Sequence, residues 1–325
     1  MIRVGVVGLG MAVAPHANSL LDLKSRVEVA YAFSPSVARR TQFAQRFPFP
    51  QCEDLDVIVK DRSVDAVLVL TPPNTHLEIV ERCAAAGKHV LLEKPLEVST
   101  QKAERLVQVC KNLKLAVVLQ HRFRPAAEKL RERLKDLGQI VSASAAIPNW
   151  RPQSYYDQPG RGTKARDGGG VLLTQAIHTL DLLLSYTGEP AEVKGFATTT
   201  PVHKMETEDL ATAAVRFRSG ALGVVHATTT AYPGFAERIE LIGTQGTALL
   251  EGTSLRMQFA DGTSLEVRTE SGGGGTGADP MAFPHDWHRS VLVDFLDSIE
   301  NNREPRVSGA EALKVHRFID ALLLG

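Results

Sequence analysis

The first 120 residues alternate short apolar runs with amphipathic segments. Apolar runs at residues 2–7, 27–33, 66–70, 89–92 and 115–119 are separated by helical patterns near 11–23, 37–46, 75–86 and 100–113. Nearly continuous, β-branched runs of this length are typical of parallel strands that helices cover on both faces. With right-handed crossovers, the pattern predicts a doubly wound parallel sheet, the Rossmann arrangement.

The pattern changes after about residue 125. An amphipathic helix at 126–137 ends at Gly138, and an apolar helix at 171–186 follows a loop rich in Gly, Arg and Tyr. From 192 to 267 the chain repeats strand-and-turn units, which predict an open, mostly antiparallel sheet. A glycine-rich loop at 271–277 and helices near 287–301 and 309–324 complete the chain. We therefore expect an α/β protein with a Rossmann domain at 1–122 and an α+β domain at 123–325, whose C-terminal helix packs back on the first domain.

Composition narrows the class of protein. The 325 residues carry 37 Lys and Arg against 37 Asp and Glu, so the formal net charge is zero. This balance argues against nucleic-acid and membrane-surface binding, and no apolar run is long enough to span a bilayer. The three cysteines have neither CxxC nor zinc spacing, and the N-terminus lacks a signal-peptide pattern. We expect a cytoplasmic protein with reduced thiols.

The first candidate site is Gly8-Leu9-Gly10, between the first strand and the first helix. Glycines at this turn let the backbone approach a pyrophosphate, which the N-terminus of the helix beginning near Met11 and Ala12 would receive. Val13 occupies the place of the third small residue, and a tight turn alone would also explain two glycines. The strand–turn–helix context favours dinucleotide binding.

The end of the second strand bears on the choice of dinucleotide. A site for NAD would place Asp or Glu there, whereas this chain has Ser34 and, one helical turn later, Arg39 and Arg40. Hydroxyls and a guanidinium can bind a 2′-phosphate, so the sequence favours NADP over NAD. The alternative is that the two arginines belong to a solvated helix face.

Two motifs follow consecutive strands: Thr71-Pro72-Pro73-Asn74-Thr75-His76 and Glu93-Lys94-Pro95. Together with the glycine turn and the change of pattern after residue 125, they resemble the glucose-fructose oxidoreductase/inositol dehydrogenase (Gfo/Idh/MocA) family along essentially the whole chain. The resemblance implies that NAD(P) is bound by Thr71, Pro72, Asn74, His76, Glu93 and Lys94. It also implies a cis bond before Pro95 in many members and a hinge segment at 120–125. There we expect cofactor or packing contacts, rather than catalytic roles, for Gln120, His121 and Arg122, and we name Gln120 as a cofactor-binding candidate.

The second half carries a glycine triplet at 168–170 and then an apolar helix. Its polar exceptions Thr174, His178, Asp181 and Ser185 have spacings of 4, 3 and 4, which predict a single face. We expect the amides at the start of this helix to be free for a ligand oxygen. The alternative is a solvent-facing stripe, although the helix lacks Lys, Arg and Glu.

The family motif in this helix is an Asp, three residues and then the catalytic His. His178 matches the histidine, while Thr174 stands where the aspartate is usual, so the resemblance implies Lys94 and His178 as the catalytic pair. A histidine needs little tuning to accept a proton near pH 7, so we assign His178 as proton acceptor and Lys94 as the cation that stabilises the alkoxide. The reverse assignment stays open.

The substrate candidates are Thr174 and Asp181 of this helix and, in the loop before it, Trp150, Arg151, Tyr156 and Arg161. Aromatic faces and guanidinium groups suit a sugar or a carboxylated ring. His285, Asp286 and His288 have the types of metal ligands, but Asp286 at a helix start is explained by the helix dipole, so we predict no metal site.

These observations predict an NAD(P)-dependent oxidoreductase that transfers a hydride between nicotinamide and a secondary hydroxyl or ketone of a sugar, polyol or cyclic hydroxyl compound. Two alternatives stay open: a non-catalytic NAD(P)-binding sensor, and a redox-neutral NAD-dependent glycosidase. The expected partners are a sugar-like or polyol substrate and further copies of the chain, as a homodimer or homotetramer. Neither nucleic acid nor membrane is expected.

Overall fold

A computed structural model describes residues 1–268 and 284–324. The chain divides into two compact units, one formed by residues 1–119 with 285–313 and the other by 120–284 with 314–325. The predicted glycine-rich loop at 271–277 lies outside the described residues. In the part of the chain that is described, no helix combines the length and apolar character needed to cross a membrane.

The first unit contains a six-stranded sheet in the order β3-β2-β1-β4-β5-β6, with every neighbouring pair parallel. The strands are β1 (Ile2–Val7), β2 (Val27–Phe33), β3 (Gln51–Cys52), β4 (Ala66–Val69), β5 (His89–Leu92) and β6 (Leu115–Val117). All four residues of β4 are completely buried because helices cover both faces of the sheet. This arrangement confirms the predicted Rossmann fold.

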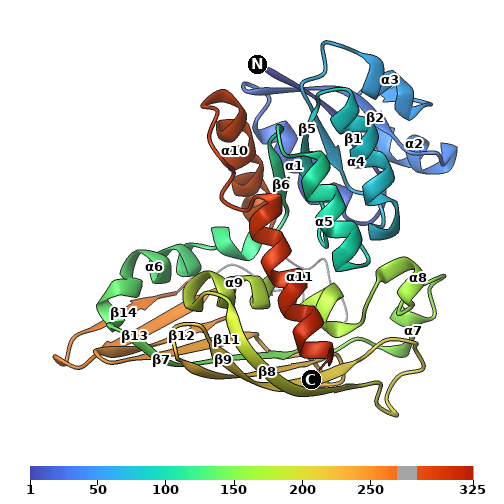
Figure 1. The fold of residues 1–325 in the computed structure, drawn as a ribbon. Helices are drawn as coiled ribbons and strands as arrows, with labels where there is room; N and C mark the ends of the chain where they lie inside the picture. Colours follow the sequence, from blue (N-terminus) through green and yellow to red (C-terminus); the bar gives the residue numbers. More distant parts are fainter. Residues whose placement is uncertain (269–283, 325) are drawn as a thin grey trace. The chain divides into compact units, whose positions relative to one another are not determined.

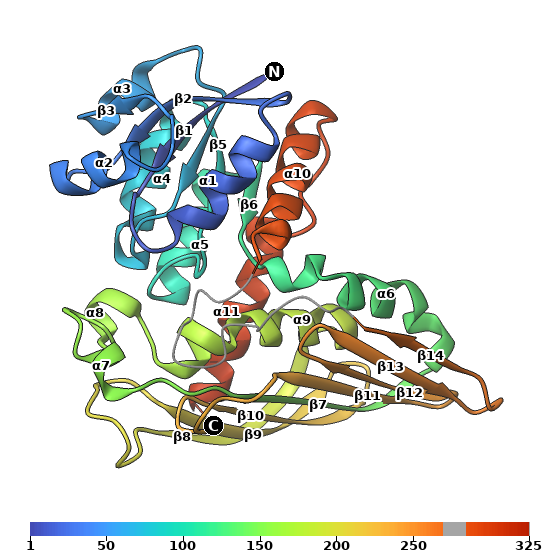
Figure 2. The same cartoon turned by 180° about the vertical axis from the view of Figure 1, so that it is seen from behind.

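Helices join and cover these strands. They are α1 (Val13–Asp22), α2 (Val37–Ala44), α3 (Leu55–Lys60), α4 (His76–Ala85), α5 (Thr100–Val109) and α10 (Asp286–Glu300), with a short 3₁₀ turn, η1 (Pro73–Thr75). Helix α4 packs beside α5 on one face, and α1 packs beside α10 on the other (Figures 1 and 2). Helix α10, although last but one in the chain, therefore completes the first unit.

The second unit is built on an eight-stranded sheet in the order β14-β13-β12-β11-β7-β10-β9-β8. Its pairs are antiparallel except for β7 with β10. The strands are β7 (Ile140–Pro148), β8 (Pro190–Thr198), β9 (Leu210–Phe217), β10 (Leu222–Thr228), β11 (Arg238–Gly243), β12 (Gly246–Glu251), β13 (Ser254–Phe259) and β14 (Ser264–Val267). The open, mostly antiparallel sheet was predicted and is confirmed.

In the part of the chain that the structure describes, helices cover one face of this sheet. They include α6 (Pro125–Arg133) and α9 (Ile177–Thr187), preceded by η2 (Gln120–Phe123) and a π-helical turn, η4 (Leu172–Ala176). Shorter elements are η3 (Leu134–Leu137), α7 (Gln153–Tyr156) and α8 (Lys164–Asp167), and α11 (Gly309–Leu324) ends the chain. Burial alternates along β9 because only every second side chain faces these helices. The opposite face carries exposed side chains.

Two buried histidines should make the fold sensitive to mild acid. Burial lowers the pKa of His288 to about 3 and that of His316 to about 4, against 6.5 for an exposed histidine. The unfolded chain therefore binds more protons than the folded one below pH 6.5, so the free energy of unfolding falls as the pH falls toward 4. The slope should approach about 1.4 kcal/mol per pH unit for each histidine. Urea unfolding at several pH values measures it.

The variant His316→Gln provides the control, because it removes one of these two titrating groups. Its slope of stability against pH should be shallower than that of the natural chain by about 1.4 kcal/mol per pH unit, the share of one histidine. Equal slopes for the two proteins would contradict the assignment.

Candidate active site

The glycine turn after β1 has the geometry that a pyrophosphate requires. Gly8 has φ +104°, and a Cβ there would lie 2.7 Å from the carbonyl carbon of Leu70. A Cβ at Gly10 would meet nothing within 4 Å, so open space adjoins the turn. The first amides of α1 donate to no capping side chain, because the N-cap residue is Ala12. A tight turn, open space and an uncapped helix N-terminus fit the phosphates of a dinucleotide.

The two arginines after β2 have different environments. Arg40 is buried, and its Nη1 donates to the carbonyl oxygen of Ser34 at 2.7 Å. Arg39 is exposed, and its backbone N–H donates to the capping hydroxyl of Ser36, while its guanidinium has no hydrogen-bond partner among the described residues. Ser34 is buried, with its hydroxyl 3.4 Å from the N–H of Ser36. Of the two guanidinium groups, that of Arg39 is therefore the one available to a ligand.

His76 connects the two motifs that follow β4 and β5. Its ring is completely buried, with Nε2 2.9 Å from the carbonyl oxygen of Thr71 and Nδ1 3.1 Å from those of Pro95 and Leu96. Burial lowers the pKa of His76. The side chain predicted to line the cofactor pocket thus holds the two loops together, while Pro72 and Asn74 are exposed.

Glu93 is anchored by a histidine from another helix. Its Oε1 lies 2.8 Å from Nε2 of His16 on α1, and its Oε2 accepts from the N–H of Lys94 at 3.1 Å. Burial opposes the charge, but the hydrogen bond and charge of His16 hold the pKa of Glu93 below its usual value. The His288 ring of α10 meets the His16 ring edge to face at 5.0 Å. Lys94, half-buried and followed by a cis peptide bond to Pro95, stands on this fixed loop.

His16, Glu93 and His288 also form a group whose ligand atoms lie within 4.8 Å of one another. The hydrogen bond between His16 and Glu93 already satisfies two of those atoms, and the third residue is held neutral by burial. Among the described residues, these contacts link α1, the loop after β5 and α10. Their geometry therefore explains the group without a metal ion.

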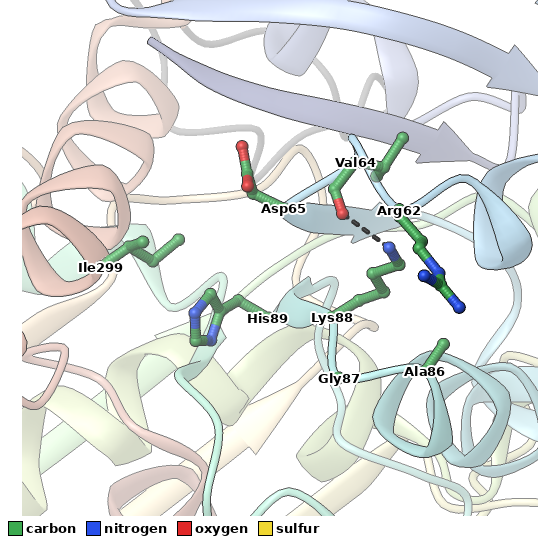
Figure 3. A pocket seen from close by; sticks show the side chains of 8 residues that line it. All are labelled: Arg62, Val64, Asp65, Ala86, Gly87, Lys88, His89 and Ile299. Carbon is green, nitrogen blue, oxygen red and sulfur yellow. Dashed lines mark hydrogen bonds between the residues drawn. The ribbon is translucent and has the colours of Figure 1, made fainter.

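A pocket lies at the opposite edge of the same sheet. Arg62, Asp65, Lys88, His89 and Ile299 contribute to its lining, at the point where β4 and β5 begin (Figure 3). The Lys88 ammonium group donates at 2.7 Å to the carbonyl oxygens of Asp61 and Val64. Open parallel sheets bind ligands at the carboxyl ends of their strands, so this pocket is not the dinucleotide site.

In the second unit, η2 contributes three buried polar side chains to the predicted hinge segment, those of Gln120, His121 and Arg122. The side-chain oxygen of Gln120 has no hydrogen-bond partner among the described residues, which fits a role in binding a ligand. Arg122 makes a bidentate pair with Asp181 of α9, with Nε and Nη2 donating at 2.7 and 2.6 Å. Both carboxylate oxygens of Asp181, which the sequence predicted as a substrate candidate, thus accept hydrogen bonds from Arg122.

The start of the predicted substrate helix differs from the expectation. The Glu208 carboxylate accepts from the N–H groups of Gly170 and Leu172 at 3.0 and 3.1 Å, and its main-chain oxygen accepts from Val171. Burial raises the pKa of Glu208. The expectation that these amides are free for a ligand oxygen is therefore wrong, because a carboxylate of the same chain occupies them.

The π-helical turn η4 alters the predicted polar face. Thr174 lies within it and donates its hydroxyl to the carbonyl oxygen of Gly170 at 2.6 Å. A π turn contains more residues than an α turn, so Thr174 is rotated away from the face expected for a regular helix. His178 lies in α9 itself, nearly buried, with its ring stacked on that of His121 at 4.7 Å between centroids.

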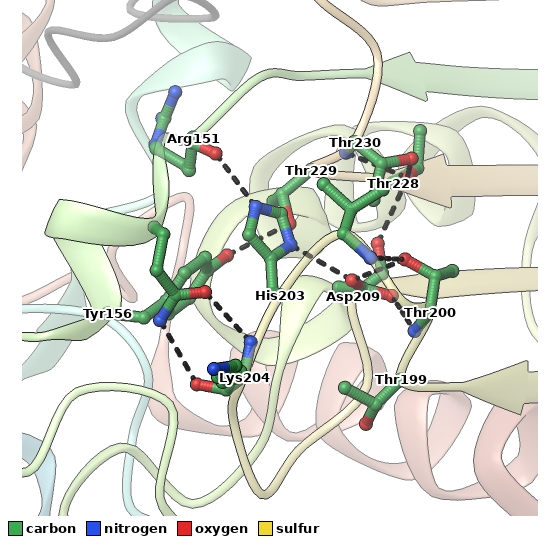
Figure 4. Close-up of polar contacts among 12 residues, drawn as sticks. Arg151, Tyr156, Thr199, Thr200, His203, Lys204, Asp209, Thr228, Thr229 and Thr230 are labelled. Carbon is green, nitrogen blue, oxygen red and sulfur yellow. Dashed lines mark hydrogen bonds and ion pairs between the residues drawn. The ribbon is translucent and has the colours of Figure 1, made fainter.

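The loop before this helix is held by a network around His203 (Figure 4). Its Nδ1 lies 2.9 Å from the buried carboxylate of Asp209, and its Nε2 lies 2.8 Å from the carbonyl oxygen of Arg151. The Tyr156 hydroxyl donates to Thr229, and burial raises the pKa of Tyr156 to about 12. These contacts fix the main chain of the loop from within.

The other loop candidates have partners of their own. The indole of Trp150 meets the ring of Tyr232 edge to face at 5.4 Å. The guanidinium groups of Arg151 and Arg161 lie 5.8 and 5.0 Å from the ring centroid of Tyr155. Arg161 also lies 3.6 Å from the Asp167 carboxylate.

Sequence reasoning missed His16 and Glu208. His16 is the ionisable residue among the buried side chains of α1, where Ser19 is also polar, and this is the signal that could have drawn attention to it. Glu208 lies 38 positions beyond Gly170, so nothing local connects the carboxylate to the amides that it caps. Long-range pairing of this kind is visible only in three dimensions.

Comparison with known proteins agrees with this geometry. Residues 2–121 match the family described as oxidoreductase family, NAD-binding Rossmann fold, and residues 127–249 match the GFO/IDH/MocA C-terminal domain. The chain is 29% identical to myo-inositol 2-dehydrogenase of Thermotoga maritima, over 100% of this chain and 94% of that protein. It is 27% identical to scyllo-inositol 2-dehydrogenase (NAD(+)) of Bacillus subtilis, over 96% and 90%.

Solved structures extend the likeness to the fold. The WlbA dehydrogenase of Bordetella pertussis, in complex with NADH and UDP-GlcNAcA, matches with a TM-score of 0.83 at 25% identity, covering 99% of this chain and 95% of that one. Levoglucosan dehydrogenase, in complex with NADH and levoglucosan, has the same fold, with a TM-score of 0.86 at 24% identity and coverage of 99% and 96%. Both domain matches and these relatives place the chain in one family: it is a member of the Gfo/Idh/MocA oxidoreductases, with an NAD-binding Rossmann domain.

Proposed function

We propose that this protein is an NAD(P)-dependent dehydrogenase or reductase acting on a secondary hydroxyl or ketone of a sugar, polyol or cyclic hydroxyl compound. The observation that carries the proposal is the loop of Lys94, which the buried Glu93–His16 pair fixes at the carboxyl edge of the Rossmann sheet. The open glycine turn lies at the end of β1 in the same sheet. Relatives named as inositol 2-dehydrogenases support a polyol or sugar-like substrate.

The proposed chemistry divides between the cofactor and two side chains. A bound nicotinamide would supply the hydride chemistry at the reacting C–H bond. His178 accepts the hydroxyl proton, and the ammonium group of Lys94 stabilises the negative charge that develops on the oxygen. Thr174 stands in place of the usual aspartate and uses its hydroxyl on the carbonyl of Gly170, so it is not assigned a proton-transfer role.

Cofactor and substrate are proposed to bind to different groups. Gly8, Gly10, Met11 and Ala12 would receive the pyrophosphate, and the loops after β4 and β5 with Gln120 would face the nicotinamide half. Trp150, Arg151, Tyr156, Arg161 and Asp181 remain substrate candidates from the sequence, of which Arg161 keeps a partly exposed guanidinium. A cytoplasmic location also stays a prediction from the sequence.

Reduced-nicotinamide absorbance tests the proposed reaction. Purified protein with NAD or NADP and a panel of sugars, sugar acids, polyols and cyclic diols should give a signal with at least one substrate. Lys94→Ala should lower kcat by about 10²–10³-fold, because it removes the cation beside the developing oxyanion. Lys102→Ala, an exposed lysine on α5, is the matched control and should leave kcat unchanged.

Other outcomes of the same assay would support the alternatives. Nucleotide binding without turnover across the panel would favour the non-catalytic sensor. Consumption of a glycoside without net change in absorbance would favour the redox-neutral glycosidase. Absence of both nucleotide binding and turnover would overturn the proposal.

The finer choice of cofactor is proposed to be NADP. The exposed guanidinium of Arg39, together with the absence of a carboxylate at residues 33–36, supports binding of a 2′-phosphate. Arg39→Ala should raise the KM for NADP about tenfold and leave that for NAD unchanged, because only NADP carries the phosphate. Arg46→Ala, which changes an exposed arginine just after the end of the same helix, is the control. Equal effects on the two cofactors would contradict the choice.

Self-association through the uncovered face of the second sheet is also proposed. Phe196 is 84% exposed, Leu222 53% and Val224 58%, and the strand registers place the three side chains on one face. Large apolar side chains gathered on an uncovered sheet face are typical of an interface between copies. The double variant Phe196→Glu, Val224→Glu should convert a homodimer or homotetramer into smaller species in light scattering. Val57→Glu, an exposed position on α3, should not; a natural chain that is monomeric would contradict the proposal.

A further inference from the structure

Four buried side chains of the second unit form a continuous series that ends at His178. Glu237, just before β11, accepts from Nη1 of Arg124 at 2.5 Å, and the same Nη1 lies 3.2 Å from the carbonyl oxygen of Gly252. Nη2 of Arg124 donates to Nε2 of His121 in η2. The His121 ring then stacks on the His178 ring, with 4.7 Å between centroids and 28° between planes. All four residues are at least nine-tenths buried.

These contacts determine where the proton of His121 lies. A guanidinium group can only donate hydrogen bonds, so Nε2 of His121 must be the unprotonated nitrogen. The proton then sits on Nδ1, which lies 3.2 Å from Oε1 of Glu237, close enough for electrostatic attraction. A second proton on the ring would have to point at Arg124, a cation. His121 is therefore held as a neutral ring with one defined tautomer.

A neutral His121 suits a neighbour that gains a proton. Two stacked imidazolium rings would repel each other, whereas a neutral ring offers its face to the cation. The other charged pair close along α9, Asp181 with Arg122, is bidentate and balanced. Arg124 in turn is balanced by Glu237. The charged groups that face the two rings thus neutralise one another in pairs, and the stack fixes the plane of His178.

We propose that His121 is a positioning residue for His178, locked as the neutral Nδ1–H tautomer by Arg124 and Glu237. The proposal rests on the proposed function in one respect, the assignment of proton transfer to His178. His121 itself is not placed at the reacting atoms, because its two ring nitrogens face Arg124 and Glu237.

Histidine-ring NMR of the full chain tests the tautomer without any substrate. Nitrogen-15 correlation spectra should give His121 the pattern of a neutral Nδ1–H ring across the pH range in which exposed histidines titrate, with His121→Phe providing the assignment. Glu237→Gln should make the neutral Nδ1–H tautomer of His121 less stable, because it removes the charge that balances Arg124. Titration of His121 in the natural chain together with the exposed histidines would overturn the proposal.

The same spectra test the effect on His178. In His121→Ala the ring signals of His178 should shift and broaden, because its stacking partner is gone, while His121→Phe, which keeps a flat ring, should restore a sharp signal. Signals of His178 that are unchanged in His121→Ala would overturn the positioning role. Thermal unfolding of both variants separates this effect from loss of the fold.

Kinetics provide the second readout. His121→Ala should lower kcat about ten- to hundredfold with KM within about twofold, because misplacing a reacting group costs rate more than binding. The limb of the pH–rate profile assigned to the proton acceptor should move in His121→Ala and return in His121→Phe. His285→Ala, a surface histidine of the first unit, is the control. Unchanged kcat and profile would overturn the role in catalysis; absence of turnover in the natural chain would instead count against the proposed function and leave the NMR result to decide.

Discussion

The hydrogen bond between the buried Glu93 carboxylate and His16 is the interaction on which the proposed cofactor edge depends. Transferring a carboxylate into the interior is costly unless partners satisfy it. His16 satisfies one oxygen and the N–H of Lys94 satisfies the other. Because His16 belongs to the helix that follows the glycine turn, this contact ties the loop of Lys94 to that turn. The hydrogen bonds that satisfy the buried Glu93 carboxylate therefore fix the position of Lys94, as packing does.

The second unit also contains buried carboxylates, and other partners satisfy them. Asp181 is paired with the guanidinium of Arg122 and Glu237 with that of Arg124, while the Glu208 carboxylate accepts hydrogen bonds from backbone amides at the start of the helix. Each pair joins segments far apart in the sequence, so each buried charge also fixes a register between elements. Removing one member of such a pair leaves the other charged and buried, which costs about 3–5 kcal/mol. Residues beside His178 therefore tolerate little displacement.

Local pattern was sufficient for the fold and insufficient for the contacts. The continuous apolar runs of β1, β4 and β5 predicted buried parallel strands, and the glycine turns after residue 190 predicted an antiparallel sheet, because burial and turn chemistry act over a few residues. The partners of Glu93 and of Gly170 lie 77 and 38 positions away. The periodicity of apolar residues along a helix or strand carries no information on contacts between residues so far apart in the sequence. The π-helical turn at 172–176 was not predicted for a related reason. An extra residue in one turn of a helix that is apolar on most sides leaves the hydrophobic pattern unchanged.

Glycine illustrates the limit most clearly, because the same residue serves two opposite purposes in this chain. At Gly10 the missing side chain leaves open space, as a turn that admits a ligand requires. At Gly170 a Cβ would lie 1.8 Å from the main-chain oxygen of Glu208, so the missing side chain lets the chain's own backbone approach. Both glycines precede a helix, and both invited the interpretation that a ligand binds there. The difference lies in what fills the space: at Gly170 it is Glu208, whose carboxylate then takes the amides that a ligand would have used.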